Sequence, residues 1–307
     1  MKPDDTSLDD SQYQTVSEAA RKLLDRGNGW GRLPTPFDDL LLAANLRVAP
    51  VSAFDEGAML RYLREAGHQA ERLLKRVIEK IRAVFDVHAN TVHIDPSMST
   101  EKQNFLKLHE TGHKELPHQR SMFRWIQDCD RHLAPETADL FEREANTFAS
   151  IVLFQDGAFS RITADSAFGI KVPIKASRLF GASVYAGIRE YIRRNKQVCA
   201  VLILEPTVIE NAIGPVAVVR RIERSASFAL RFGDYPFPKQ LTLVDSLIAC
   251  VPFEPRRMSS PRAFALTDRN GERHEFVGEG FRTPYNTFVL IHAKLGLSSR
   301  VLMSSCG

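Results

Sequence analysis

The feature that most constrains the fold is a change in hydrophobic period near residue 197. Before this point apolar residues recur at spacings of three and four, as over residues 56–84, which predicts amphipathic helices. After it, short apolar or alternating runs are separated by Gly, Pro and Asp, which predicts antiparallel strands. We therefore expect an α+β protein, in which a mainly helical domain with a small edge-strand sheet precedes a β-rich C-terminal domain.

The expected domain boundaries follow from the same change of pattern. We assign residues 16–196 to the helical domain, including a helical, helix-turn-helix-like extension that begins at about residue 159. Residues 197–307 form the β-rich domain, to which the sequence assigns no role. The polar residues 1–15 are expected to be a disordered tail, because they contain too little apolar surface to fix a structure.

The individual elements can be assigned within these domains. Residues 83–94 predict a hairpin or an edge strand with a tight turn at Ala89-Asn90, and residues 114–133 are expected to be irregular. The expected helices cover residues 16–24, 37–45, 56–84, 100–113, 135–153 and most of 159–195. The expected C-terminal strands cover residues 198–204, 215–221, 227–232, 263–266, 275–277 and 287–292.

Composition excludes several classes of protein. The net charge of +4, from 41 Lys and Arg against 37 Asp and Glu, is a weak indication of nucleic-acid binding in a chain of 307 residues. The four cysteines form no CxxC pair, which argues against a disulfide framework or a thiolate zinc site. No apolar run approaches the ~20 residues that a membrane span needs. We expect a soluble cytoplasmic protein that does not bind membranes.

The most specific motif is the sequence HETGH at residues 109–113. Residues four apart lie on one face of a helix, so His109 and His113 can present two imidazoles to one Zn²⁺. Glu110 lies about a hundred degrees round the helix from His109, which brings it within reach of a water beside the metal without making it a ligand. The motif therefore predicts one zinc ion per chain.

Three neighbouring features strengthen this prediction. Apolar residues before the motif, such as Leu108, indicate a packed helix, and Gly112 allows another backbone to approach closely. A strand precedes the helix, and an edge strand beside the site is a place where an extended peptide can add to a sheet.

A catalytic zinc needs a third protein ligand and an open fourth position. The helix over 135–153 offers four acidic residues, Glu136, Asp139, Glu142 and Glu144. We assign the third ligand to Glu142, because it lies on the apolar stripe of this helix and an inward-facing carboxylate needs a partner. Glu144 is expected to face solvent. Asn146, one turn beyond Glu142, is expected to support a ligand from behind.

These residues predict a hydrolytic mechanism. Zinc lowers the pKa of its water towards ~7 and polarises a carbonyl, and Glu110 acts as the general base that passes the proton to a leaving amine. An oxyanion donor is also required. The sequence does not choose among four candidates, which are His118, Tyr185, Arg178 and Tyr191.

The combination of FLKLHETGH at 105–113, FEREANTFAS at 141–150 and NTVHID at 90–95 resembles the ImmA/IrrE family of metallopeptidases. The resemblance covers residues 16–195, and the paired motifs are more specific than HExxH alone. It implies a small gluzincin-like fold with zinc at His109, His113 and Glu142 and with Glu110 as the base. It also implies a regulatory protease that cleaves a specific partner protein, such as a helix-turn-helix transcriptional repressor.

Two segments depart from the family pattern. Residues 151–156 (IVLFQD) differ slightly from the usual helix end, and residues 197–307 resemble no family that we can name.

Two other functions remain open. Residues 176–188 have the helix, glycine turn and helix of a DNA-binding motif, in which Arg178 and Arg189 would contact phosphates. Alternatively, the zinc is structural, and the protein binds a partner without cleaving it.

Overall fold

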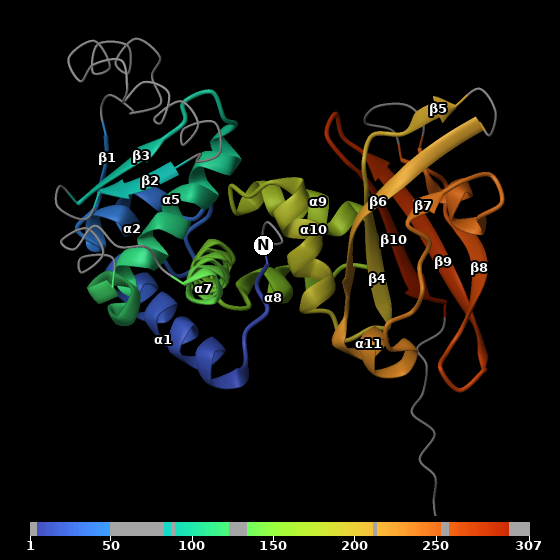
Figure 1. Cartoon of the computed structure of the whole chain (residues 1–307), viewed down its shortest axis with the longest axis horizontal. Coiled ribbons are helices and arrows are strands. Elements are labelled where there is room, and N and C mark those ends of the chain that lie inside the picture. The colour runs from blue at the N-terminus through green and yellow to red at the C-terminus, as the bar shows by residue number, and fades with distance from the viewer. Residues whose placement is uncertain are drawn as a thin grey trace, which may run out of the picture. The chain divides into compact units, whose positions relative to one another are not determined.

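The computed structural model describes residues 5–49, 83–86, 90–122, 134–210, 214–252 and 258–294. The chain forms two compact units, which we describe separately (Figure 1). The first unit combines Met1–Ile162 with Ala176–Ser183, and the second combines Thr163–Lys175 with Val184–Gly307. The helical segment that follows residue 159 is thus divided between the units, whereas the sequence pattern had placed all of it in the first domain.

The first unit is built on helices. α1 begins in a capping box, in which the Asp9 carboxylate accepts a hydrogen bond from the Gln12 amide at 2.8 Å and the Gln12 side chain accepts one from the Asp9 amide. The expected disordered tail over residues 1–15 is therefore wrong for residues 10–15, because these caps start the helix at Asp10. The helices of this unit are α1 (Asp10–Arg26), α2 (Phe37–Ala43), α5 (Thr100–Glu115), α7 (Pro135–Leu153) and α8 (Ala158–Ala164), the last of which continues into the second unit.

Helix α7 lies at the centre of the helical core. Both α1 and α5 pack against it, and the apolar side of α1 is fully buried at positions such as Val16 and Leu23 (Figure 1). Phe148 and Ala149 of α7 are also fully buried. Burial of large side chains at this spacing supplies on the order of 1.5–3 kcal/mol each, which fixes the two site-bearing helices α5 and α7 against one another.

A three-stranded sheet precedes α5. Its strands are β1 (Arg47–Val48), β2 (Ala83–Asp86) and β3 (Thr91–Ile94). β2 and β3 form the expected antiparallel pair, and Asn90 at the start of β3 has a positive φ of 51°, which asparagine tolerates in turns. β1 pairs with the other side of β3 in parallel. The strand directly before the metal-motif helix is therefore the middle strand and offers no free edge to a peptide.

Two expectations for the first unit need correction or fall outside the described residues. Residues 114–122 are mostly helical rather than irregular, since α5 runs to Glu115 and residues 117–122 form another helical turn. Residues 123–133 and most of the expected helix over 56–84 lie outside the described part of the chain.

The second unit contains an antiparallel sheet in the order β5-β6-β4-β10-β9-β8, with β7 paired to β6 (Figure 1). Its core contains the fully buried β4 and the apolar face of β10. The strands are β4 (Cys199–Leu204), β5 (Val208–Glu210), β6 (Gly214–Arg224), β7 (Gln240–Leu241), β8 (Arg262–Thr267), β9 (Arg273–Arg282) and β10 (Thr287–Ala293). The helices are α9 (Lys171–Leu179), which ends in the first unit, α10 (Val184–Arg193) and α11 (Ala226–Phe232).

The predicted α+β fold class is confirmed, and one predicted strand is wrong. Residues 227–232 form α11 because the Ser225 hydroxyl accepts a hydrogen bond from the Phe228 amide and caps the helix. Phe228 and Phe232, four residues apart, then pack together on one face. Among the described residues, no helix is both long and apolar enough to cross a membrane.

Candidate metal centre

The two histidines of the sequence motif meet on one face of α5. His109 and His113 are 7% and 5% exposed, and their Nε2 atoms lie 3.2 Å apart. Their rings are nearly perpendicular, at 86°. The four-residue helical spacing creates this approach, since it stacks the two side chains one turn apart. Two imidazole nitrogens are thereby directed at one point.

Helix α7 adds the carboxylate. One Glu142 oxygen lies 3.3 Å from Nε2 of His109, and the other lies 3.6 Å from Nε2 of His113. The three side chains offer ligand atoms that all lie within 4.8 Å of one another. Two imidazoles and one carboxylate are a donor set that suits zinc and leaves a position open. The Glu142 side chain is 36% exposed, so the group opens towards solvent on the side of α7.

The electrostatics of the group favour a bound cation. Burial lowers the pKa of His109, but the hydrogen bond to Glu142 and the charges of Glu110 and Glu142 outweigh burial and raise it above its usual value. Burial, together with the charge on His109, lowers the pKa of His113 to about 4. Burial raises the pKa of Glu142, but the hydrogen bond and charge of His109 lower it overall. Glu142 is therefore anionic and His113 neutral, as metal ligands need, while a bound metal would replace the proton that His109 shares with Glu142.

Each histidine is oriented from behind by a side-chain amide. Asn146 Oδ1 lies 3.1 Å from Nδ1 of His109, and Gln119 Oε1 lies 2.6 Å from Nδ1 of His113. An amide oxygen can only accept, so each Nδ1 carries a proton and each Nε2 is the ring nitrogen that faces the metal position. Asn146 was predicted in this role. Gln119 was not, because it lies in a segment with no clear helical pattern.

Glu144 does not face solvent as the sequence predicted. It is 3% exposed, and one of its oxygens accepts hydrogen bonds from Gln119 Nε2 at 2.6 Å and is 2.7 Å from His118 Nε2. The prediction failed because the helical turn over residues 117–122 covers this face of α7, and it supplies the polar partners that a buried carboxylate needs. Glu144 thus fixes the Gln119 amide and, through it, His113.

The candidate general base lies beside the group. Glu110 is 7% exposed on α5, and its charge contributes to the raised pKa of His109. A buried carboxylate next to two imidazoles is the arrangement that the HExxH spacing predicts.

Gly112 allows α5 and α7 to approach closely. A Cβ at this position would lie 3.2 Å from the Ala145 Cα and 3.2 Å from the Phe148 ring. Because Glu142 is on the same helix as these neighbours, the spacing between α5 and α7 also sets the distance of Glu142 from the histidines. The absence of a side chain at residue 112 is therefore part of the site.

Replacing Gly112 with valine should lower stability by about 1–3 kcal/mol, because the added methyl groups overfill the contact between α5 and α7. It should also weaken zinc binding, since α7 would carry Glu142 away from the histidines. Thermal unfolding and a zinc titration measure the two effects. Gly112→Ala is the graded control, in which a gain in helix propensity of ~1 kcal/mol offsets milder crowding. An unchanged melting temperature and zinc affinity in Gly112→Val would contradict this role.

The structure does not select one of the four oxyanion candidates. His118 is engaged by Glu144, and Arg178 is exposed on α9. Tyr185 and Tyr191 belong to the second unit; Tyr185 lies beneath the Arg189 guanidinium, and burial raises the pKa of Tyr191 to about 12. The assignment of an oxyanion donor stays a prediction.

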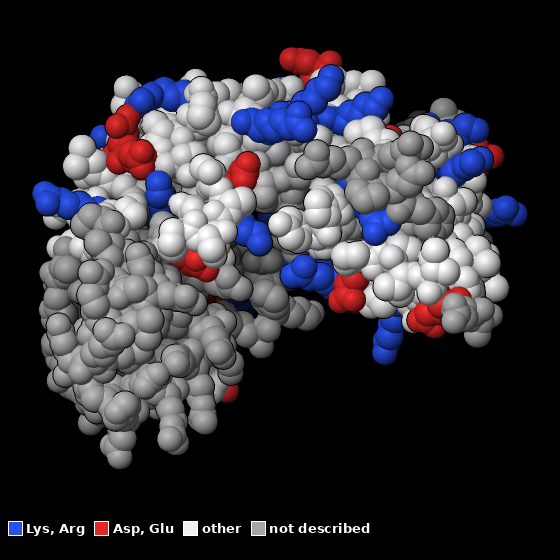
Figure 2. Space-filling model, turned by 90° about the horizontal axis from the view of Figure 1, so that it is seen from above, with Lys and Arg blue, Asp and Glu red and all other residues white. Residues whose placement is uncertain are grey.

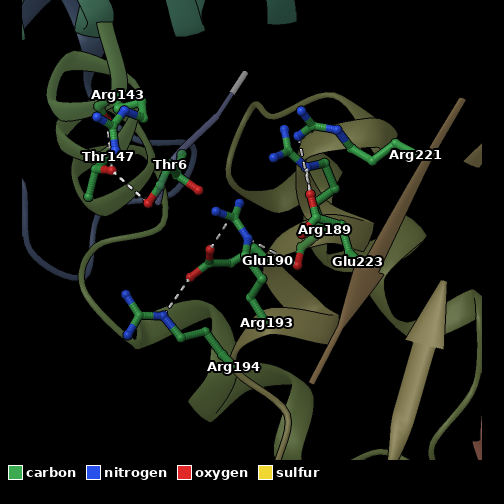
Figure 3. Close-up of polar contacts among 9 residues, drawn as sticks. All are labelled: Thr6, Arg143, Thr147, Arg189, Glu190, Arg193, Arg194, Arg221 and Glu223. Carbon is green, nitrogen blue, oxygen red and sulfur yellow. Dashed lines mark hydrogen bonds and ion pairs between the residues drawn. The ribbon is translucent and has the colours of Figure 1, made fainter. Parts of the chain in front are cut away.

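Helices α9 and α10 occupy the segment that the sequence assigned to a helix-turn-helix, but much of the second helix is buried. α10 packs on β4 and β6, and the Arg189 side chain is 6% exposed. Its Nε donates to Glu223 at 2.6 Å, and Arg221 contacts the same carboxylate (Figure 3). Basic and acidic side chains are also interspersed on the face of the molecule in Figure 2. The structure therefore does not support the alternative in which Arg189 contacts phosphates, because a buried ion pair holds its charge.

A second acidic group lies in the second unit. Asp268, Glu272 and His274 bring ligand atoms within 4.8 Å of one another. Asp268 closes the turn between β8 and β9, accepting from the amides of Asn270 and Glu272. His274 Nε2 is 2.9 Å from the Asp268 carboxylate. These contacts explain the position of Asp268 by its role in closing the turn.

Comparisons with known proteins bear on the first unit. Residues 72–186 match the family model described as Peptidase_M78, the IrrE N-terminal-like domain. A search of the curated proteins gave no match. A solved Mycobacterium tuberculosis transcriptional regulator is similar with a TM-score of 0.47 and 11% identity, over 95% of this chain and 92% of that chain. The matched family segment contains α5, α7 and all three members of the metal group.

Proposed function

We propose that this protein is a zinc-dependent metallo-endopeptidase, because residues 72–186 match the IrrE N-terminal-like domain of the peptidase M78 family. Zinc is held by His109, His113 and Glu142. The observation that carries the proposal is the convergence of these three side chains, together with an amide oxygen behind each imidazole that directs its Nε2 at the same point. Two histidines that only pack in the core, without a metal, would not require an amide oxygen behind each ring.

Residues of the chain transfer the proton and orient the zinc ligands during hydrolysis. Zinc in such a site supplies a Lewis acid for a carbonyl oxygen and lowers the pKa of water to about 7. The Glu110 carboxylate takes a proton from the attacking water and delivers it to the nitrogen of the leaving amine. Asn146 and Gln119 hold the imidazoles in place throughout, so that little reorganisation accompanies the reaction.

We further propose that the protease is regulatory and cleaves one partner protein, such as a helix-turn-helix transcriptional repressor. The family resemblance supports this substrate class. Burial of the site supports a restricted substrate range, since His109, Glu110 and His113 are each less than a tenth exposed. An extended segment must therefore be presented to the exposed side of Glu142.

The proposal is tested by metal content and by cleavage together. The purified protein should bind one zinc per chain, and with zinc it should generate a small set of new protein N-termini in an extract of its own cells, detected by mass spectrometry. Removal of zinc with a chelator should abolish these cleavages, and added zinc should restore them. A protein that binds no zinc at micromolar concentrations would overturn the assignment.

A further inference from the structure

The N-terminal segment of the chain lies along α7 directly behind the metal group. Arg143 Nη1 donates to the carbonyl of Ser7 at 2.7 Å, and Asn146 Nδ2 donates to the carbonyl of Asp5 at 3.2 Å. The Thr147 hydroxyl contacts the carbonyl of Thr6 at 3.4 Å and that of Arg143 at 2.8 Å (Figure 3). Side chains of α7 therefore contact three successive main-chain carbonyls, whatever side chains the segment carries.

Asn146 joins this segment to the metal group. Its Oδ1 is 3.1 Å from Nδ1 of His109, while its Nδ2 donates to Asp5. A main-chain carbonyl can only accept a hydrogen bond, so the amide must present its NH₂ group to Asp5 and its oxygen to His109. Asn146 is 8% exposed, which leaves little water to replace the carbonyl. The opposite orientation would present the NH₂ group to Nδ1 of His109 and favour the tautomer that carries its proton on Nε2.

We propose that the main chain of Asp5–Ser7 is a positioning element of the metal group. It fixes the orientation of the Asn146 amide and, through it, keeps the proton of His109 on Nδ1 and its Nε2 free for zinc. The inference rests on the proposed function, because it assumes that the group binds zinc. Gln119 does the same for His113, but its amide is fixed by Glu144 and the carbonyl of Phe141, which lie on α7 itself. Of these two supports, the one for His109 depends on a segment outside the helical core.

Displacement of the segment should therefore weaken zinc binding. Loss of an outer partner of a metal-ligating histidine costs about 10- to 100-fold in metal affinity, and we expect about tenfold here, since Asn146 itself remains. Deletion of residues 2–7 removes the carbonyls and leaves the α1 cap at Asp9 intact. Arg143→Ala loosens the segment without shortening the chain. Asp139→Asn is its control, because it removes the ion pair of Arg143 with Asp139 and leaves the bond to Ser7.

The decisive test is a double-mutant cycle on the full chain. Asn146→Asp keeps an acceptor for His109 but has no NH₂ group for the Asp5 carbonyl, so the orientation no longer depends on the segment. Zinc dissociation constants are measured by competition with a chelator for the unsubstituted protein, the 2–7 deletion, Asn146→Asp and the combination. We expect the deletion to raise the constant about tenfold in the Asn146 protein and to leave it unchanged in the Asn146→Asp protein.

A spectroscopic measurement separates positioning from a general loss of structure. The Nδ1–H proton of His109 in the zinc-loaded protein should give a visible resonance while Asn146 protects it, and the resonance should broaden in the deletion and Arg143→Ala proteins. Equal zinc affinity in the unsubstituted and deleted proteins would overturn the inference, and so would the same loss in the Asn146→Asp background. Absence of zinc binding by the unsubstituted protein would instead overturn the proposed function, and this inference with it.

Discussion

A Glu110→Gln protein will bind zinc as tightly as the unsubstituted protein and will cleave its target about 10²- to 10⁴-fold more slowly. The amide has the size of the carboxylate but cannot accept the proton of the attacking water, and general-base catalysis is worth about this factor. Glu110 is not among the three side chains whose ligand atoms converge, so the metal group should be unaffected. Cleavage rate and zinc content are measured on the same preparation.

The controls for Glu110→Gln also separate the two remaining functions. Glu115→Gln is a matched substitution on the same helix, at a carboxylate that pairs with Arg26 at 2.8 Å away from the motif, and it should cleave normally. If Glu110→Gln retained full biological activity while bound to zinc, the protein would act by binding a partner, with structural zinc. That result would overturn the peptidase proposal but not the assignment of the zinc ligands.

The second large effect is expected at Glu142. A Glu142→Gln protein should lose zinc affinity by more than the 10- to 100-fold that an outer partner contributes, because the substitution removes an anionic ligand from between two imidazoles. The chain should remain folded, since this side chain is 36% exposed. The measurement is a zinc titration against a chelator, with the metal content of the purified protein determined in parallel.

Two substitutions on α7 make this prediction specific. Glu136→Gln removes the same charge from the exposed first turn of the helix and should leave zinc affinity unchanged. The zinc affinity of Glu144→Gln should lie between those of Glu136→Gln and Glu142→Gln. This substitution weakens the hydrogen bonds that orient Gln119 without removing a ligand. Equal zinc affinities for Glu136→Gln and Glu142→Gln would show that Glu142 is not the third ligand.

The paired motifs made the metal group predictable. Helical periodicity decides which residues share a face, so the HExxH spacing was enough to bring His109 and His113 together. The apolar stripe of α7 pointed to Glu142, whose carboxylate does converge with the histidines, although Glu144 is the more buried of the two. Asn146 followed from the same stripe, because it lies one turn beyond Glu142. These predictions needed only the geometry of a single helix and the cost of burying a carboxylate without a partner.

Predictions about contacts between elements were less successful. Glu144 was expected in solvent because helical geometry gives only the direction of its side chain. It does not show that residues 117–122 cover that face of α7. Arg189 was a candidate for a DNA contact in the alternative function because its neighbours have the pattern of a second recognition helix, yet Glu223 of β6 holds it in a buried pair. Gln119 was missed, since a partner for His113 can come from any segment that folds over it.

The sequence by itself thus determined the fold class, the two site-bearing helices and the candidate set His109, Glu110, His113 and Glu142, because these depend on periodicity within one element. Only the tertiary structure decided the partners of that set. Hydrogen bonds of Gln119, Glu144 and the N-terminal carbonyls join segments far apart in the chain, and a hydrogen bond depends on distances of a few tenths of an ångström. Such distances follow from how α5 and α7 pack at Gly112, where the sequence indicates a close approach but not which backbone makes it.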